Sequence, residues 1–284
     1  MNYRHIYHAG NFADVIKHLL LIQIIEHLKQ KEAAFFVLDT HAGTGMYDLH
    51  STEALKTNEA VSGIGRILAA STPTSHPVIR KYINIIQHFN ANSDCKTLSK
   101  YPGSPALIAS LIRPQDRLLA NELHPEDYAS LRQVAAQFLT PIKTLHLDAY
   151  TALKANLPPK EQRGLVLIDP PFEDKEEFTS LALHLKQALK RWQHGTYMIW
   201  FPLKLHLPIA QFYEEISALS TSKTLLIEGW AHPAYTPNNF NGSGLIILNT
   251  PWQLDTVLKE YIPFLNTHLF TANAPGIKLR WLAP

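Results

Sequence analysis

Residues 164–172 read Gly-Leu-Val-Leu-Ile-Asp-Pro-Pro-Phe, and this stretch decides the fold. The run 164–168 is short, apolar and uninterrupted, which is typical of a strand buried on both faces of a parallel sheet. Two prolines then end the strand, because proline fixes φ and cannot donate to a strand ladder. The sequence therefore places Asp169, Pro170 and Phe172 at the carboxyl end of a strand, where open α/β sheets bind ligands.

These residue types suit the recognition of an amino group on a nucleobase. The Asp169 carboxylate and the Pro170 carbonyl can each accept one N–H of an adenine amino group, which directs the nitrogen lone pair outward. The Phe172 ring can stack on the base, a contact worth roughly 1–3 kcal/mol. The alternative is a turn that only ends a strand. An Asp169 side chain tied to a lysine and walled off from any cavity would contradict the functional interpretation.

Apolar runs alternate with helical patterns along the rest of the chain. Amphipathic segments at 126–138 and 176–192 separate predicted strands, and a loop rich in Pro, Asn and Gly joins two late strands as an antiparallel hairpin. This alternation predicts an α/β fold with a doubly wound sheet. The predicted strands lie at 33–39, 117–122, 142–148, 164–169, 196–201, 223–230 and 244–249.

One region interrupts the alternation. Between Tyr47 and Tyr101 the sequence predicts two helices, at 58–70 and 77–90, and no convincing strand. We therefore expect a helical insertion after the first strand, with 48–100 as an inserted subdomain and 1–47 plus 101–284 as the catalytic domain. The insertion either covers the core or contacts nucleic acid. Its candidate contacts are Arg66, Arg80, Lys81, Lys96 and Lys100.

Three predicted strands end in residues that suit a nucleoside. The first ends in Asp-Thr-His-Ala-Gly-Thr-Gly at 39–45, where glycines permit a tight turn and close approach of a ligand. The full Gly-x-Gly-x-x-Gly pattern is missing because position 48 is Asp, which disfavours a dehydrogenase. The second strand ends in Glu122, placed to accept from a ribose hydroxyl, and the third in Asp148, placed to meet an adenine amino group.

Composition limits the remaining classes. The chain has 284 residues, a net charge of +2 and a pI near 8.5, which permits a nucleic-acid partner without requiring one. The lone Cys95 excludes an internal disulfide, and no signal peptide or membrane span is apparent, so we expect a cytoplasmic protein. We expect no metal site, since no spacing among the N-terminal histidines matches a known ligand set. These histidines are His5, His8, His18 and His41.

The motifs together resemble a known family. Asp39-x-x-x-Gly-x-Gly and Asp169-Pro-Pro-Phe resemble the motifs of class I S-adenosylmethionine-dependent amino methyltransferases. Further islands in the same order resemble the RlmJ family, which methylates N6 of an adenine in 23S ribosomal RNA. The resemblance implies a Rossmann-like sheet of seven strands, the last one antiparallel. The islands lie at 3–5, 8–18, 39–43, 101–105, 122–125, 167–171, 243–244 and 249–252.

The resemblance also implies individual roles. Glu122 would bind the ribose of S-adenosylmethionine and Asp148 its adenine, while Asp169, Pro170 and Phe172 would serve catalysis. Tyr3 would reach the target adenosine of 23S ribosomal RNA, and no obligate protein partner is evident, so we expect a monomer. The full set of cofactor-binding residues would be Lys17, His18, His41, Gly43, Ser104, Glu122, Asp148, Ala149 and Asp169.

Some features depart from the family or allow another interpretation. Phe172 stands where Tyr is common, Ala149 where Gly is frequent, and Met46 where a basic residue is common. Ser104 also fits a helix N-cap, with Pro105 at the first helical position. Two alternatives stay open: a non-catalytic RNA-binding protein on a methyltransferase scaffold, and an adenine-N6 methyltransferase that acts on DNA.

Overall fold

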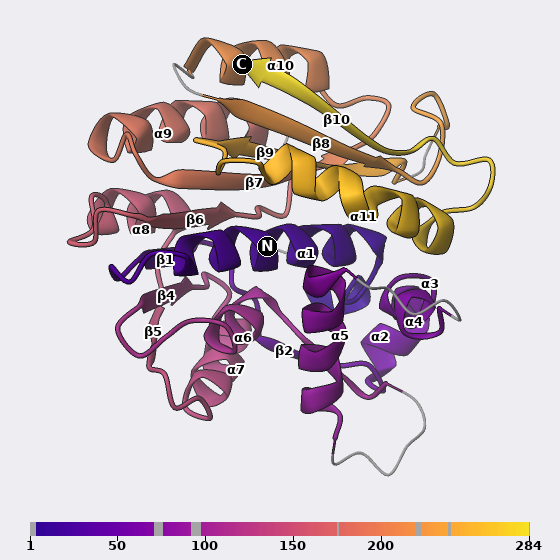
Figure 1. Cartoon of the computed structure of the whole chain (residues 1–284), viewed down its shortest axis with the longest axis horizontal. Helices are drawn as coiled ribbons and strands as arrows, with labels where there is room; N and C mark the ends of the chain where they lie inside the picture. Colours follow the sequence, from indigo (N-terminus) through magenta and orange to yellow (C-terminus); the bar gives the residue numbers. More distant parts are fainter. Residues whose placement is uncertain are drawn as a thin grey trace.

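A single large sheet with helices on both faces forms the centre of the molecule (Figure 1). The computed structural model describes residues 4–70, 76–91, 98–174, 176–219, 223–237 and 240–283. Five neighbouring strands pair in parallel, and the chain then adds antiparallel strands at one side. Across the sheet the order is β10 (Gly276–Ala283), β8 (Thr224–Trp230), β9 (Gly242–Leu248), β7 (Thr196–Leu203), β6 (Gly164–Ile168), β1 (Phe36–Asp39), β4 (Arg117–Asn121) and β5 (Ile142–Leu145).

The predicted strands are confirmed, with one correction to their number. The late hairpin exists as β8 and β9, which pair antiparallel. The sheet has eight strands rather than seven, because the C-terminal residues form β10 on its edge, antiparallel to β8. The sequence of β10 alternates charged Lys278 and Arg280 with apolar residues. A half-exposed edge strand has no continuous apolar run, and this strand was therefore missed.

Alternation along each strand sends side chains into two hydrophobic layers. In β6, Leu165 and Leu167 face one layer, while Val166 and Ile168 face the other. Helices α1, α5 and α11 lie on the near side of the sheet in Figure 1. The first layer contains α1 (Phe12–Lys29), α5 (Pro77–Phe89), α6 (Ser104–Ala109) and α11 (Leu254–Leu269); the second contains α8 (Ala149–Asn156), α9 (Glu177–Arg191) and α10 (Ile209–Leu219); and α7 (Pro125–Ala135) packs against β5.

Helix α1 is buried on nearly every side. Asn11 begins it as the N-cap, its side-chain oxygen accepting from the backbone N–H of Asp14 at 3.0 Å. Lys17 and His18 are both buried within it, so polar groups of this helix point into the protein. Within the described part of the chain, no helix combines the length and the apolar character that crossing a bilayer requires.

The helical insertion after β1 is confirmed, but its elements differ from those predicted. A short antiparallel ribbon of β2 and β3 closes its base. The buried face of α5 joins the same hydrophobic core as α1, so the insertion packs against helices that cover this face of the sheet. The division into an inserted subdomain and a catalytic domain stays a prediction. The inserted elements are β2 (Met46–Asp48), α2 (Thr52–Thr57), α3 (Glu59–Ser62), α4 (Ile64–Leu68), α5 and β3 (Lys100–Pro102).

The single helix predicted at 58–70 is broken at Gly63. The backbone there leaves the helical region, with φ −101° and ψ −105°. A Cβ on Gly63 would lie 2.1 Å from the carbonyl oxygen of Gly10 and 2.6 Å from the carbonyl carbon of Asn11. The break therefore lets α3 and α4 approach the backbone just before α1.

This close approach leads to a prediction for stability. Gly63→Ala should lower the free energy of unfolding by roughly 1–3 kcal/mol, because the added methyl group forces one backbone away from the other. Urea denaturation measures the change. Ser62→Ala, at an exposed neighbouring position, should stay within about 0.5 kcal/mol of the unmodified protein. An equal effect of both substitutions would contradict the close contact.

Candidate active site

A cavity of about 210 Å³ lies at the carboxyl ends of β1, β4 and β6. The glycine turn after β1, the acidic ends of the neighbouring strands and the start of α1 all reach it. Tyr3 lies outside the described residues, and Phe172 is not among the residues that line the cavity. The other predicted site residues line it together: Lys17, His18, His41, Gly43, Ser104, Glu122, Asp148, Ala149, Asp169 and Pro170.

Asp169 is both paired and open to the cavity. Its Oδ2 lies 2.6 Å from Lys17 Nζ, and 15% of its side chain is exposed. A lysine partner alone would weigh against the proposed role, but Asp169 also lines the cavity beside Pro170. Both residues that supply the predicted acceptors at the end of β6 therefore line the cavity.

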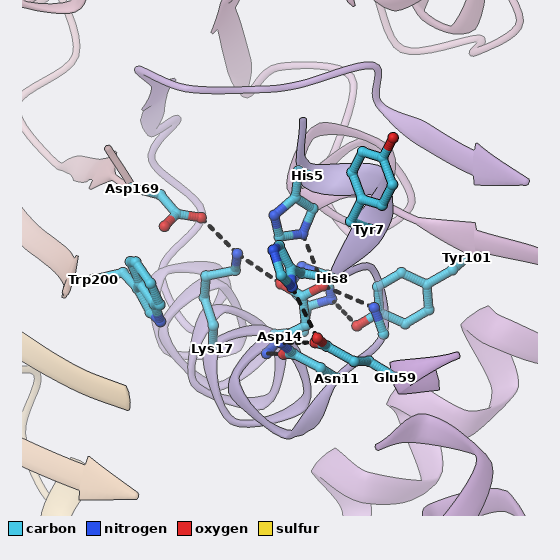
Figure 2. Close-up of polar contacts among 12 residues, drawn as sticks. His5, Tyr7, His8, Asn11, Asp14, Lys17, Glu59, Tyr101, Asp169 and Trp200 are labelled. Carbon is cyan, nitrogen blue, oxygen red and sulfur yellow. Dashed lines mark hydrogen bonds and ion pairs between the residues drawn. The ribbon is translucent and has the colours of Figure 1, made fainter. Parts of the chain in front are cut away.

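Lys17 links two carboxylates that come from different elements. Its Nζ lies 2.8 Å from Asp14 Oδ1, and Asp14 Oδ2 in turn lies 2.9 Å from His5 Nε2 (Figure 2). Burial disfavours the charged form of Lys17, but Asp14 and Asp169 outweigh it and hold the pKa of Lys17 well above its ordinary value. Burial likewise opposes ionisation of Asp14, and the charges of His5 and Lys17 hold its pKa well below the usual range. Ion pairs thus connect Asp14, Lys17 and Asp169, and His5 contacts this group through Asp14.

Two histidines in the cavity wall are neutral. Burial lowers the pKa of His18 to about 3 and that of His41 to about 4. His18 stacks on Tyr101 and its Nδ1 lies 2.9 Å from the Tyr101 hydroxyl, while His41 Nδ1 lies 2.8 Å from Thr40 Oγ1. Each imidazole therefore serves as a polar, uncharged group at neutral pH.

The acidic strand ends are fixed by backbone N–H groups. Glu122 accepts from Gly43 N at 2.8 Å and from His124 N at 2.7 Å, which ties the end of β4 to the glycine turn. Burial raises the pKa of Glu122. Asp148 is the N-cap of α8 and accepts from Thr151 N at 2.8 Å. Both carboxylates thus have fixed positions on the cavity wall.

Ser104 does not cap a helix as its sequence position suggested. Gly103 occupies the N-cap of α6, and Ser104 is the first helical residue. The Ser104 hydroxyl instead donates to Asp39 Oδ2 at 2.6 Å. Burial, with a smaller contribution from the negative charge of Asp169, raises the pKa of Asp39 to about 7. Asp39 is therefore a partly protonated group directly behind the cavity.

Phe172 lies in a group of aromatic rings. Its centroid is 4.6 Å from that of Phe178 and 6.0 Å from that of Trp200. Its φ of +50° is unusual for a residue with a bulky side chain, and such a conformation persists only where its surroundings enforce it. The prolines and the aromatic contacts hold this turn, while base stacking by Phe172 stays a prediction.

Comparison with known proteins identifies the family. The sequence model described as "Ribosomal RNA large subunit methyltransferase D, RlmJ" matches residues 32–283. The chain belongs to the RlmJ family. Two relatives named ribosomal RNA large subunit methyltransferase J match it along its whole length. The Haemophilus influenzae protein is 39% identical over 285 residues, covering 100% of this chain and 99% of the relative; the Escherichia coli protein is 37% identical over 284 residues, with the same coverage.

A solved structure shares the fold of this chain. The crystal structure of a protein from Legionella pneumophila str. Philadelphia 1 superposes with a TM-score of 0.84 at 35% identity. It covers 96% of this chain and 97% of its own. The resemblance noted from the sequence motifs is therefore confirmed, and so is the Rossmann-like methyltransferase fold.

Sequence reasoning gave no site role to His5 or Asp14, and it named Asp39 only as the acidic end of the first strand. His5 lines the cavity, Asp14 lies buried behind it, and Asp39 accepts from Ser104. His5 and Asp14 belong to sequence islands that carry the family resemblance, and this was the available signal. Across the described residues, no group of three or more His, Cys, Asp or Glu side chains is placed to share a metal ion.

The raised pKa of Asp39 predicts a pH dependence of stability. Its pKa is about 7 in the folded protein against an ordinary value of 3.8, so the folded state binds more protons between these pH values. Protonated Asp39 therefore contributes to the free energy of unfolding in full below about pH 4, and this contribution is lost as the pH rises through 7.

Asp39→Asn cannot ionise, so it should gain stability relative to the unmodified protein as the pH rises from 4 to 8. Between these two pKa values, the difference in the free energy of unfolding should grow by about 1.4 kcal/mol per pH unit, and it should level off above pH 7. Urea unfolding of both proteins across this range measures it. Parallel pH profiles would contradict a protonated Asp39.

Proposed function

We propose that this protein transfers a methyl group from S-adenosylmethionine to N6 of an adenosine in 23S ribosomal RNA. The observation that carries the proposal is the meeting of Asp169, Pro170 and the glycine turn in one cavity. The names of the full-length relatives support a ribosomal RNA substrate. Such a substrate is consistent with the cytoplasmic location expected from composition.

The residues of the cavity fit this cofactor. Gly43 has a φ of +59°, which strains any other residue, and a Cβ there would lie 2.2 Å from the Tyr47 hydroxyl and would displace it. Glu122 would accept from ribose hydroxyls and Asp148 from the adenine amino group. S-Adenosylmethionine supplies an electrophilic methyl group on a positively charged sulfur. Carboxylates along the wall favour a cation in the cavity.

Asp169 and Pro170 would position the nucleophile. The amino nitrogen of adenine is weakly nucleophilic because its lone pair is delocalised into the ring. The Asp169 carboxylate and the Pro170 carbonyl would each accept one of its N–H groups and direct the lone pair toward the methyl carbon. Lys17 holds one oxygen of Asp169 at 2.6 Å and so limits the rotation of the carboxylate. The second oxygen is left to receive the substrate.

The target adenosine would have to leave its RNA stack to reach this cavity. The inserted segment offers cations that could hold the surrounding RNA. Arg80 and Lys100 are exposed, whereas Lys81 pairs with a glutamate of α1 at 2.6 Å and Arg66 donates to a carbonyl group of α11. Lys96 lies outside the described residues. Arg80 and Lys100 are therefore the stronger candidates for RNA contacts.

The test of this function is incubation of the purified protein with radiolabelled S-adenosylmethionine and separate pools of ribosomal RNA, transfer RNA and DNA. Label in ribosomal RNA alone, recovered as N6-methyladenosine, is the expected result. Label in DNA would favour the DNA methyltransferase alternative. RNA binding without any incorporation would favour the non-catalytic alternative.

Asp169 provides the first mutational prediction. Asp169→Ala should abolish methyl transfer because one of the two acceptors for the amino group is lost, while cofactor affinity should change only modestly. Initial rates and calorimetric titration with S-adenosylmethionine measure the two effects. Asp174→Ala, at an exposed acidic position in the same loop, should retain activity. Retained methylation by Asp169→Ala would refute the catalytic assignment.

Phe172 provides a second mutational prediction. Phe172→Ala should weaken RNA binding more than cofactor binding, by up to roughly 1–3 kcal/mol if the ring stacks on the base. Phe172→Tyr should remain active because the stacking surface is kept. Separate affinities for RNA and for S-adenosylmethionine distinguish the two effects. Equal weakening of both would indicate that Phe172 only packs against Phe178 and Trp200.

A further inference from the structure

Helices α2–α4 of the insertion hold the segment that precedes α1. The Thr57 hydroxyl donates to the carbonyl oxygen of Tyr7, and Ile64 N donates to the carbonyl oxygen of Gly10 at 2.8 Å. Gly63 lies against the same backbone. This segment directly follows His5, whose side chain lines the cavity. The insertion therefore contacts the chain close to the candidate active site.

Glu59 makes polar contacts with two side chains at this junction. Its Oε1 lies 3.0 Å from His8 Nδ1, and its Oε2 accepts from Asn11 Nδ2 at 2.9 Å (Figure 2). Burial favours the neutral form of Glu59, but the bonds from His8 and Asn11 outweigh it and lower its pKa. An ionised carboxylate with two partners on one segment fixes that segment more firmly than a single surface ion pair.

Asn11 connects Glu59 with the residues around the cavity. While its amide nitrogen donates to Glu59, its oxygen accepts from Asp14 N at 3.0 Å and caps α1. The Asp14 carboxylate accepts from Gly10 N at 2.9 Å and contacts both His5 and Lys17. A displacement of Asn11 would therefore shift the groups that orient Asp169.

We propose that Glu59 is a positioning residue, through which the inserted helices hold the N-terminal segment so that His5 and Lys17 face the cavity. Glu59 does not touch the cavity itself. Its effect passes through Asn11 and Asp14. The activity readouts of this proposal rest on the proposed methyl transfer, whereas the structural readout does not.

Kinetics of three variants test the proposal. Glu59→Ala should lower kcat for ribosomal RNA by about tenfold or more, because small displacements of catalytic groups are costly. Glu59→Gln keeps an oxygen that can accept from Asn11, so its kcat should be intermediate. Glu53→Ala removes an exposed glutamate of α2 and serves as the matched control, with kcat unchanged. The Tm of each variant shows whether the fold is intact.

Hydrogen exchange followed by mass spectrometry supplies the second readout. Peptides that cover residues 4–11 should exchange faster in Glu59→Ala than in Glu53→Ala, with no RNA or cofactor present. Suppose that the unmodified protein methylates RNA, and that Glu59→Ala keeps its kcat within about twofold while its Tm falls. Glu59 would then contribute to stability alone, and the proposal would be overturned. If the unmodified protein methylates nothing, the proposed function fails. Unchanged exchange in residues 4–11 would then overturn this inference separately.

Discussion

The buried ammonium group of Lys17 joins the two halves of the site. It lies 2.8 Å from Asp14 on its own helix and 2.6 Å from Asp169 at the end of β6. A buried charge is costly unless it is paired, and removal of one partner leaves the others uncompensated. Residues three apart share one face of a helix, so Asp14 and Lys17 meet without further constraint. The pairing with Asp169 then fixes where the start of α1 lies relative to the sheet.

The sheet could be predicted because its central strands are buried on both faces. A short apolar run such as that of β6 favours a buried strand over a buried helix because prolines end it after five residues. Prediction failed where tertiary contacts decide local structure. Gly63 weakens a helical pattern locally but does not by itself require a break, and the close approach of Gly10 and Asn11 decides it. Strand β10 has an edge position and an alternating pattern, and only its pairing with β8 makes it a strand.

The site was predictable to the extent that topology alone brings residues together. The carboxyl ends of parallel strands lie at one edge of a sheet, so Glu122, Asp148 and Asp169 were expected at the same edge. The hydrogen bonds among the side chains did not follow from topology. Ser104 had a plausible local role as a cap, yet in the structure it donates to Asp39, which is distant in sequence. The position of the N-terminal segment could not be predicted either, because it depends on contacts with helices α2–α4, which lie much later in the chain.

The balance of charge in the cavity agrees with a cationic ligand. Lys17 has a positive charge that the neighbouring Asp14 and Asp169 offset, and burial keeps His18 and His41 neutral. Glu122 and Asp148 lie on the same wall of the cavity. Among the described residues, no cationic side chain is paired with either carboxylate. In a cavity of low dielectric constant, such carboxylates attract a sulfonium group more strongly than they would in water. Protonated histidines at these positions would cancel that attraction, so burial of the two imidazoles would favour the proposed cofactor as well as contribute to packing.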